Sequence, residues 1–94
     1  MRLVFDRRAE FDLESIGDYI ATDNPTRAVS FVREIREHCE RLMRFPEASR
    51  LRPEYGPNVR ASVFRRYLIF YVVDGGALRI RRVVHGARNL PGIV

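Results

Sequence analysis

The chain has 94 residues, the length of one small domain, and we assign residues 1–94 to a single domain. All 17 basic residues are arginine, and with 12 acidic residues the net charge is +5, which favours acidic or polyanionic partners. The excess is local, because residues 47–94 carry nine arginines against three acids, a net charge of +6.

Cysteine content and hydropathy exclude several classes of protein. Cys39 is the single cysteine, so neither an internal disulfide nor a cysteine zinc site is possible. No apolar run approaches the roughly 20 residues that a membrane span needs, and no secretion signal follows Met1. We therefore expect a cytoplasmic protein that contacts no membrane and holds no metal or other cofactor.

The first half of the chain predicts a strand and two helices. Residues 2–5 are short and apolar, as in a strand, and Asp6 can cap a helix from residue 7 to about residue 22. Asn24 and Pro25 form a strong start signal for a second helix, which we expect to run to about Phe45 before Pro46 ends it. Because the connection is tight, the helices form an antiparallel hairpin.

The second half predicts a loop and three strands. A proline-rich loop over residues 46–58, with one helical turn near residues 49–51, leads to strands at 59–64, 66–73 and 77–85. Asp74, Gly75 and Gly76 form a hairpin turn between the last two. The fold class is therefore α+β: an N-terminal strand, a helical hairpin, and a mostly antiparallel sheet of three C-terminal strands.

Alternation along the last strand divides its side chains between two faces. Leu78, Ile80, Arg82 and Val84 should face the helices, and Arg79, Arg81, Val83 and His85 the other side. An arginine that faces helices needs an acidic partner, and Asp12, Glu10 or Asp18 could supply it; we take Asp12–Arg82 as a structural ion pair.

The basic residues of the C-terminal half form the candidate binding site. They can make a face for a polyanion or an acidic partner, or a solvated face with no such role. His85 can act as a general acid or base, or simply bond to backbone. His38 has no second ligand at metal spacing, and the serines have no evident base. The target-binding set is Arg60, Arg66, Arg79, Arg81, His85 and Arg88.

Short motifs in a fixed order give the chain a family resemblance. They are Asp12-Leu13 and Tyr19-Ile20-Ala21, then Asp23-Asn24-Pro25, then Tyr67-Leu68-Ile69-Phe70-Tyr71, and finally Arg82-Val83-Val84-His85-Gly86-Ala87-Arg88. In this order and spacing the chain resembles the ParE branch of the RelE/ParE superfamily, the toxins of type II toxin–antitoxin modules. The resemblance implies the same α+β fold.

The resemblance also implies a function and partners. ParE-like toxins are associated with inhibition of DNA gyrase and with plasmid stabilisation, and a cognate ParD-like antitoxin with an acidic C-terminal segment holds them inactive in a hetero-oligomer. An amphipathic segment of that antitoxin could dock on the apolar residues Phe11, Tyr19 and Val29 of the helical hairpin. We therefore expect a toxin that binds its target and has no confident catalytic residue.

Two alternatives remain open. RelE-like members cleave mRNA on the ribosome, and such a site would use His85 and Arg88 here. However, Tyr67 stands where those nucleases carry an arginine, and the tail after Arg88 lacks their terminal tyrosine. The other alternative is a degenerate, non-toxic member that retains only its binding role.

Overall fold

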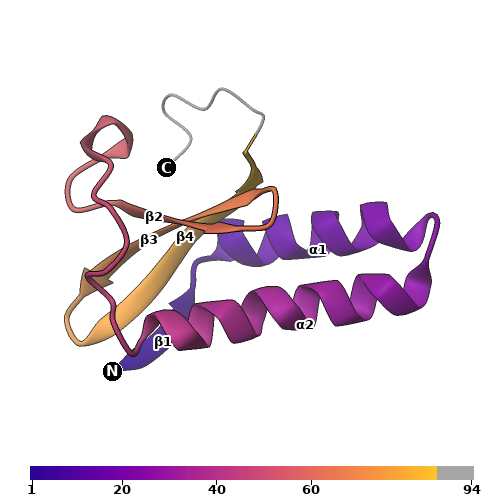
Figure 1. Cartoon of the computed structure of the whole chain (residues 1–94), viewed down its shortest axis with the longest axis horizontal. Coiled ribbons are helices and arrows are strands. Elements are labelled where there is room, and N and C mark those ends of the chain that lie inside the picture. Colours follow the sequence, from indigo (N-terminus) through magenta and orange to yellow (C-terminus); the bar gives the residue numbers. More distant parts are fainter. Residues whose placement is uncertain (87–94) are drawn as a thin grey trace.

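A hairpin of two helices packs on one face of a four-stranded sheet (Figure 1). The computed structural model describes residues 1–86, so the candidate residue Arg88 lies outside the described part of the chain. Helices α1 (Arg7–Ala21) and α2 (Pro25–Leu42) lie side by side, and their connection points away from the sheet. The start signal at Asn24 is confirmed, because its side chain accepts a hydrogen bond from the Arg27 amide at 3.0 Å.

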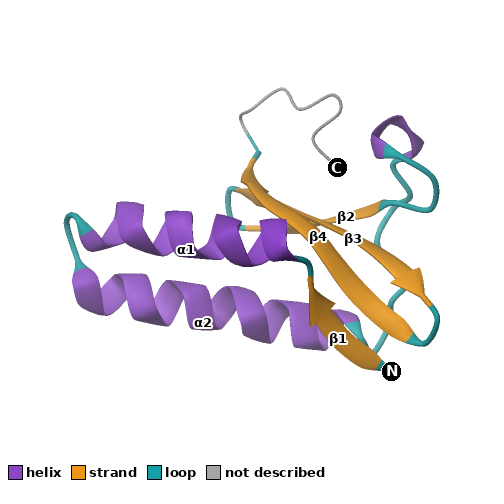
Figure 2. Cartoon of the chain, turned by 180° about the vertical axis from the view of Figure 1, so that it is seen from behind, coloured by secondary structure: helices purple, strands orange, loops and turns teal. Residues whose placement is uncertain are grey.

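The sheet has the order β1-β4-β3-β2, and the predicted α+β fold is confirmed (Figure 2). Its strands are β1 (Arg2–Phe5), β2 (Arg60–Phe64), β3 (Tyr67–Asp74) and β4 (Ala77–His85). The three C-terminal strands pair antiparallel, whereas β1 pairs parallel with β4, with Arg2 opposite Ala77. Strand β1, at the edge of the described sheet, therefore depends on β4 for its ladder hydrogen bonds.

The end of α2 and the position of the short helical turn differ from the prediction. α2 ends at Leu42 rather than near Phe45. A turn follows it, in which the Phe45 amide donates a hydrogen bond to the Leu42 carbonyl at 3.2 Å. The helical turn in the loop lies at Pro53–Tyr55 rather than at residues 49–51. Proline fixes the backbone angle that begins such a turn, which explains the shift to Pro53.

The two faces of the sheet bury two separate clusters. The larger cluster lies under the helices and joins Leu13, Ile35 and Tyr71, all at most 1% exposed, to Leu78 and Ile80. The smaller cluster, on the opposite face, includes Val59, Phe70, Val72 and Val84, with Tyr55 from the loop packed against it. Since both faces are covered, β3 reads as a continuous apolar run, as the sequence predicted.

A β-bulge in β4 changes which side chains face the helices. Phe70 pairs with Arg82 but the next residue, Tyr71, pairs with Ile80, so Arg81 is an extra residue in the strand. Simple alternation therefore fails beyond Ile80. Val83 joins the cluster under the helices and Val84 the opposite cluster, the reverse of the prediction. His85 follows Val83 by two residues and returns to the helix side, where it meets Tyr67.

Two polar contacts fasten α2 and the loop to the sheet. The hydroxyl of Tyr71, a fully buried residue, donates to the carbonyl of Pro46 at 2.8 Å. His38 Nε2 lies 2.8 Å from the Ser62 hydroxyl on edge strand β2, so Ser62 does have a basic neighbour, contrary to the sequence analysis. No carboxylate contacts His38 within residues 1–86, so this contact links helix to strand and forms no catalytic triad. No helix in this part of the chain is both long enough and apolar enough to cross a membrane.

The protein should lose stability as the pH falls through about 6.5, the ordinary pKa of histidine. Burial lowers the pKa of His38, and the positive charge of Arg41 adds to that shift. Below pH 6.5 the unfolded chain takes up a proton that native His38 resists, so the free energy of unfolding falls until the pH reaches the lower native pKa. Urea denaturation between pH 7.5 and about 5.5 measures the slope.

Two variants isolate His38 as the source of that slope. His38→Gln should flatten it, because the titrating group is gone. Ser62→Ala is the matched control: it removes the hydrogen bond but keeps the histidine buried, and should retain the slope. An equally steep slope in His38→Gln would contradict the assignment.

Candidate partner-binding groove

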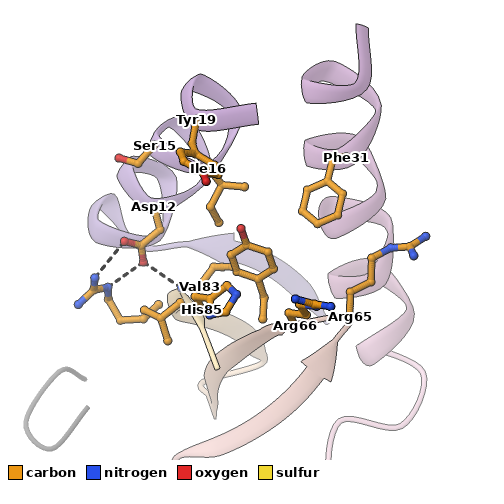
Figure 3. A pocket seen from close by; sticks show the side chains of 12 residues that line it. Asp12, Ser15, Ile16, Tyr19, Phe31, Arg65, Arg66, Val83 and His85 are labelled. Atoms are coloured by element: carbon orange, nitrogen blue, oxygen red, sulfur yellow. Dashed lines mark hydrogen bonds and ion pairs between the residues drawn. The ribbon is translucent and has the colours of Figure 1, made fainter. Parts of the chain in front are cut away.

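A groove of about 750 Å³ opens between α1, the end of β4 and the turn from β2 to β3 (Figure 3). Side chains of α1 form one wall, and Phe31 of α2 lies across the gap from them, on the same side as Arg65 and Arg66 of the opposite rim. The lining consists of Asp12, Ser15, Ile16, Tyr19, Phe31, Arg65, Arg66, Tyr67, Arg82, Val83, Val84 and His85. Three segments that are far apart in the sequence therefore share one concave surface.

Asp12 forms the wall's main polar contact. Its carboxylate accepts hydrogen bonds from Arg82 Nε at 2.7 Å and Nη2 at 2.9 Å, so the expected ion pair is present. The same carboxylate accepts the Val83 amide at 2.9 Å. Both side chains are largely buried, with 12% of Asp12 and 14% of Arg82 exposed. Hydrogen bonding to Asp12 raises the pKa of Arg82, which stays charged.

The reason for the pair differs from the predicted one. After the bulge, Arg82 has the parity of Val84 rather than of Leu78. It reaches Asp12 along the open edge of β4, because β1 stops pairing at Ile80 and leaves the next stretch of that edge to α1. The Asp12 carboxylate thus accepts the hydrogen bond of the Val83 amide, which a carbonyl of a neighbouring strand would otherwise accept.

The rim opposite α1 is a tight turn made of two arginines. Arg65 has φ = 53°, a left-handed conformation that costs an ordinary side chain on the order of 1 kcal/mol, and Arg66 follows it. The Gly86 amide donates to the Arg66 carbonyl at 2.7 Å. A Cβ on Gly86 would lie 3.2 Å from that oxygen, so glycine permits this close approach between the end of β4 and the turn.

Aromatic side chains from both helices and from two strands line the groove. Tyr19 is 77% exposed on α1, whereas Phe31 is buried. The rings of Tyr67 and His85 meet edge to face with centroids 5.4 Å apart, and Phe31 packs against Tyr67 at 5.7 Å. The groove therefore offers an apolar floor with cationic groups at its rim, the composition of a binding surface.

The predicted target-binding residues do not form one face. Arg66 and His85 share the groove, but Arg79 and Arg81 both pair with Asp6, at 3.0 and 3.3 Å. Asp6 consequently makes no side-chain cap on α1, although it precedes the helix as predicted. Arg60 lies at the far end of β2 and donates to the carbonyls of Glu47 and Ser49 in the loop, at 3.1 and 2.7 Å.

The predicted docking residues are all exposed, but only one reaches the groove. Phe11 is 67% exposed and Val29 is 68% exposed, and neither lines the groove. Tyr19 does, together with Ile16 and Phe31, which the sequence analysis missed because at helical spacing they resemble ordinary core residues. Within residues 1–86, no group of three or more histidine, cysteine or acidic side chains is placed to hold a metal ion.

The family of the chain follows from a comparison of sequence. The family model described as the ParE toxin of the type II toxin–antitoxin system parDE matches residues 3–90. The chain belongs to the ParE toxin family. This confirms the toxin–antitoxin family that the motifs indicated. No curated protein sequence matches the chain.

A solved structure agrees with the ParE assignment. The chain is similar to one described as the chromosomal ParDE TA system from P. aeruginosa, with a TM-score of 0.78 and 27% identity. The match covers 90% of this chain and 95% of the other. The helical hairpin and mostly antiparallel sheet are therefore those of a ParE toxin.

Replacement of Asp12 by alanine should destabilise this ParE protein by about 3 kcal/mol, because a buried guanidinium would lose its counter-charge. The Val83 amide would also lose its acceptor. Urea denaturation monitored by circular dichroism measures the loss. Glu14→Ala, an exposed position on the same helix, is the control and should change stability by less than about 0.5 kcal/mol. A loss of that small size in Asp12→Ala would contradict the role assigned to the pair.

Proposed function

We propose that this ParE-family protein is a toxin that blocks replication through DNA gyrase and is neutralised by a ParD-like antitoxin. The observation that carries the proposal is the family match over residues 3–90, which assigns the chain to toxins of the parDE type. The similar solved structure is described as a ParDE system, which supports an antitoxin partner for this chain as well. We place the complex in the cytoplasm, where gyrase acts.

The chemistry of the groove supports binding over catalysis. Asp12, the acidic residue of the groove, has its carboxylate committed to Arg82 and Val83 and is poorly placed to take a proton from a substrate. Tyr67 stands where RelE-like nucleases are expected to carry an arginine, and it packs on His85 and Phe31. We therefore propose that the toxin acts without catalysing a reaction.

The helical hairpin and the groove supply the docking surface for the antitoxin. Phe11, Tyr19 and Val29 are each more than 60% exposed, so their apolar side chains are accessible to a partner. Phe11 and Tyr19 stand eight residues apart on α1, so an amphipathic helix could cover both.

Induction of the protein without an antitoxin should arrest growth and induce the DNA damage response. Purified protein should inhibit supercoiling of relaxed plasmid by gyrase in a dose-dependent way, which a gel assay measures. The variant Arg66→Gln alters an exposed residue of the predicted target-binding set and should weaken this inhibition while remaining folded. Unchanged supercoiling at saturating protein would exclude gyrase as the target.

The alternative is a ribosome-dependent nuclease, favoured by the position of His85 in a groove with an arginine rim. It requires transcript cleavage soon after induction, and His85→Gln should abolish that cleavage. Intact transcripts in arrested cells would exclude this alternative, whereas the absence of any growth arrest would identify a degenerate, non-toxic member.

A further inference from the structure

We propose that Arg66 is the specificity-determining residue of the groove, and that it receives one acidic side chain from an amphipathic helix whose apolar face covers Ile16, Tyr19 and Phe31. This inference rests on the proposed antitoxin partner and adds the chemistry that the partner must carry. Arg66 differs from Arg65 and Arg82, the other arginines that line the groove among residues 1–86, because each of those two lies against a carboxylate.

Among residues 1–86, three arginines line the groove, and two of them have acidic partners. Arg82 is held by Asp12 in a bidentate pair, and Arg65 lies 3.4 Å from Glu34, which also pairs with Arg27. The side chain of Arg66 is exposed and makes no hydrogen bond or ion pair within residues 1–86. The groove thus offers one uncommitted guanidinium in this part of the chain, and a carboxylate fits such a group in a bidentate arrangement.

The backbone fixes Arg66 at the rim although its side chain has no partner among residues 1–86. The Gly86 amide binds its carbonyl at 2.7 Å, and Tyr67, the next residue, pairs with His85 in the sheet. Arg65 accepts a left-handed conformation at the preceding position, where glycine or asparagine would cost less. Two arginines in a strained turn beside an apolar groove indicate that the position is used for binding.

The rest of the groove suits a helix rather than an added strand. An extended partner would need free backbone groups along the open edge of β4, but the Val83 amide on that edge is already bonded to Asp12. The apolar lining on the helix side comes from Tyr19, which is 77% exposed, and from the edges of Ile16 and Phe31, which are 9% and 8% exposed. The groove volume of about 750 Å³ exceeds a single side chain. Two turns of a helix about 10 Å in diameter occupy a volume of about this size.

The distribution of charge also favours an acidic helix over a nucleic acid as the partner of the groove. A phosphate backbone presents a charge at every nucleotide and is bound by several cations in a row. Here Arg79 and Arg81 pair with Asp6, Arg60 bonds to the loop, and Arg66 alone among the groove arginines is uncommitted within the described residues. A partner with one acidic residue flanked by apolar residues would pair with Arg66 and cover the apolar lining beside it.

The test is a selection from a phage-displayed library of helical peptides, each about 16 residues long, against the full-length protein. Enriched peptides should carry an aliphatic or aromatic stripe with a glutamate or aspartate at one fixed position beside it. A synthetic peptide from the selection is then compared with its glutamine counterpart by fluorescence anisotropy. The acidic peptide should bind about tenfold more tightly, and the difference should shrink at high salt.

Three variants of the protein locate that preference. Arg66→Gln should remove the tenfold difference between the two peptides, whereas Arg33→Gln, the same charge change at an exposed residue of α2 outside the groove, should retain it. Gly86→Ala keeps every charge but crowds the Arg66 carbonyl, and should weaken the preference without abolishing binding of the apolar stripe. Circular dichroism checks that each variant is folded.

Several outcomes would overturn the inference. These are no enrichment of peptides, enrichment without an acidic position, an unchanged preference in Arg66→Gln, or displacement of the selected peptide by a single-stranded RNA of similar length. Growth arrest on induction is scored separately. Growth arrest without an acidic preference would reject the role of Arg66 and leave the proposed toxin function intact. An acidic preference without growth arrest would support the role of Arg66 and reject the proposed toxin function.

Discussion

The carboxylate of Asp12 holds the first helix against the last strand at the point where the sheet loses an edge strand. β1 pairs only as far as Ile80, so the amide of Val83 would otherwise be left without an acceptor in a largely buried position. Asp12 accepts that amide and neutralises Arg82 with the same two oxygens. One side chain of α1 thereby joins the helix to the end of β4, two of the three segments between which the groove opens.

The sequence patterns that predicted the fold involve neighbouring residues. They do not predict features that depend on pairing between strands. Asn24 and Pro25 specify the start of α2, and Gly75 and Gly76, both with positive φ, allow the tight turn before β4. The bulge at Arg81 has no comparable signal, because it is set by pairing with Phe70 and Tyr71 ten or so residues away. The predicted ion pair between Asp12 and Arg82 is therefore correct, although the side-chain alternation from which it was predicted ends at the bulge.

The groove was only partly predictable for a related reason. Tyr19, Arg66 and His85 were each identified, but for two different partners, and only the folded chain brings them to one surface. The charge of the C-terminal half was a poor guide to an interaction face, because Asp6, Asp12 and Glu34 from the near-neutral half neutralise arginines of the basic half. In a chain this small, which arginines stay unpaired at the groove matters more than the net charge.

The parallel pairing of β1 with β4 has a consequence for how the toxin is made. Residues 2–5 find their strand partners at residues 77–80, so the sheet closes only after residue 80 has left the ribosome. Pairing between such distant segments is a slow step in folding. A nascent chain that lacks β4 has neither Arg82 for Asp12 nor a floor for the groove, so an incomplete translation product cannot present the surface on which a partner would dock.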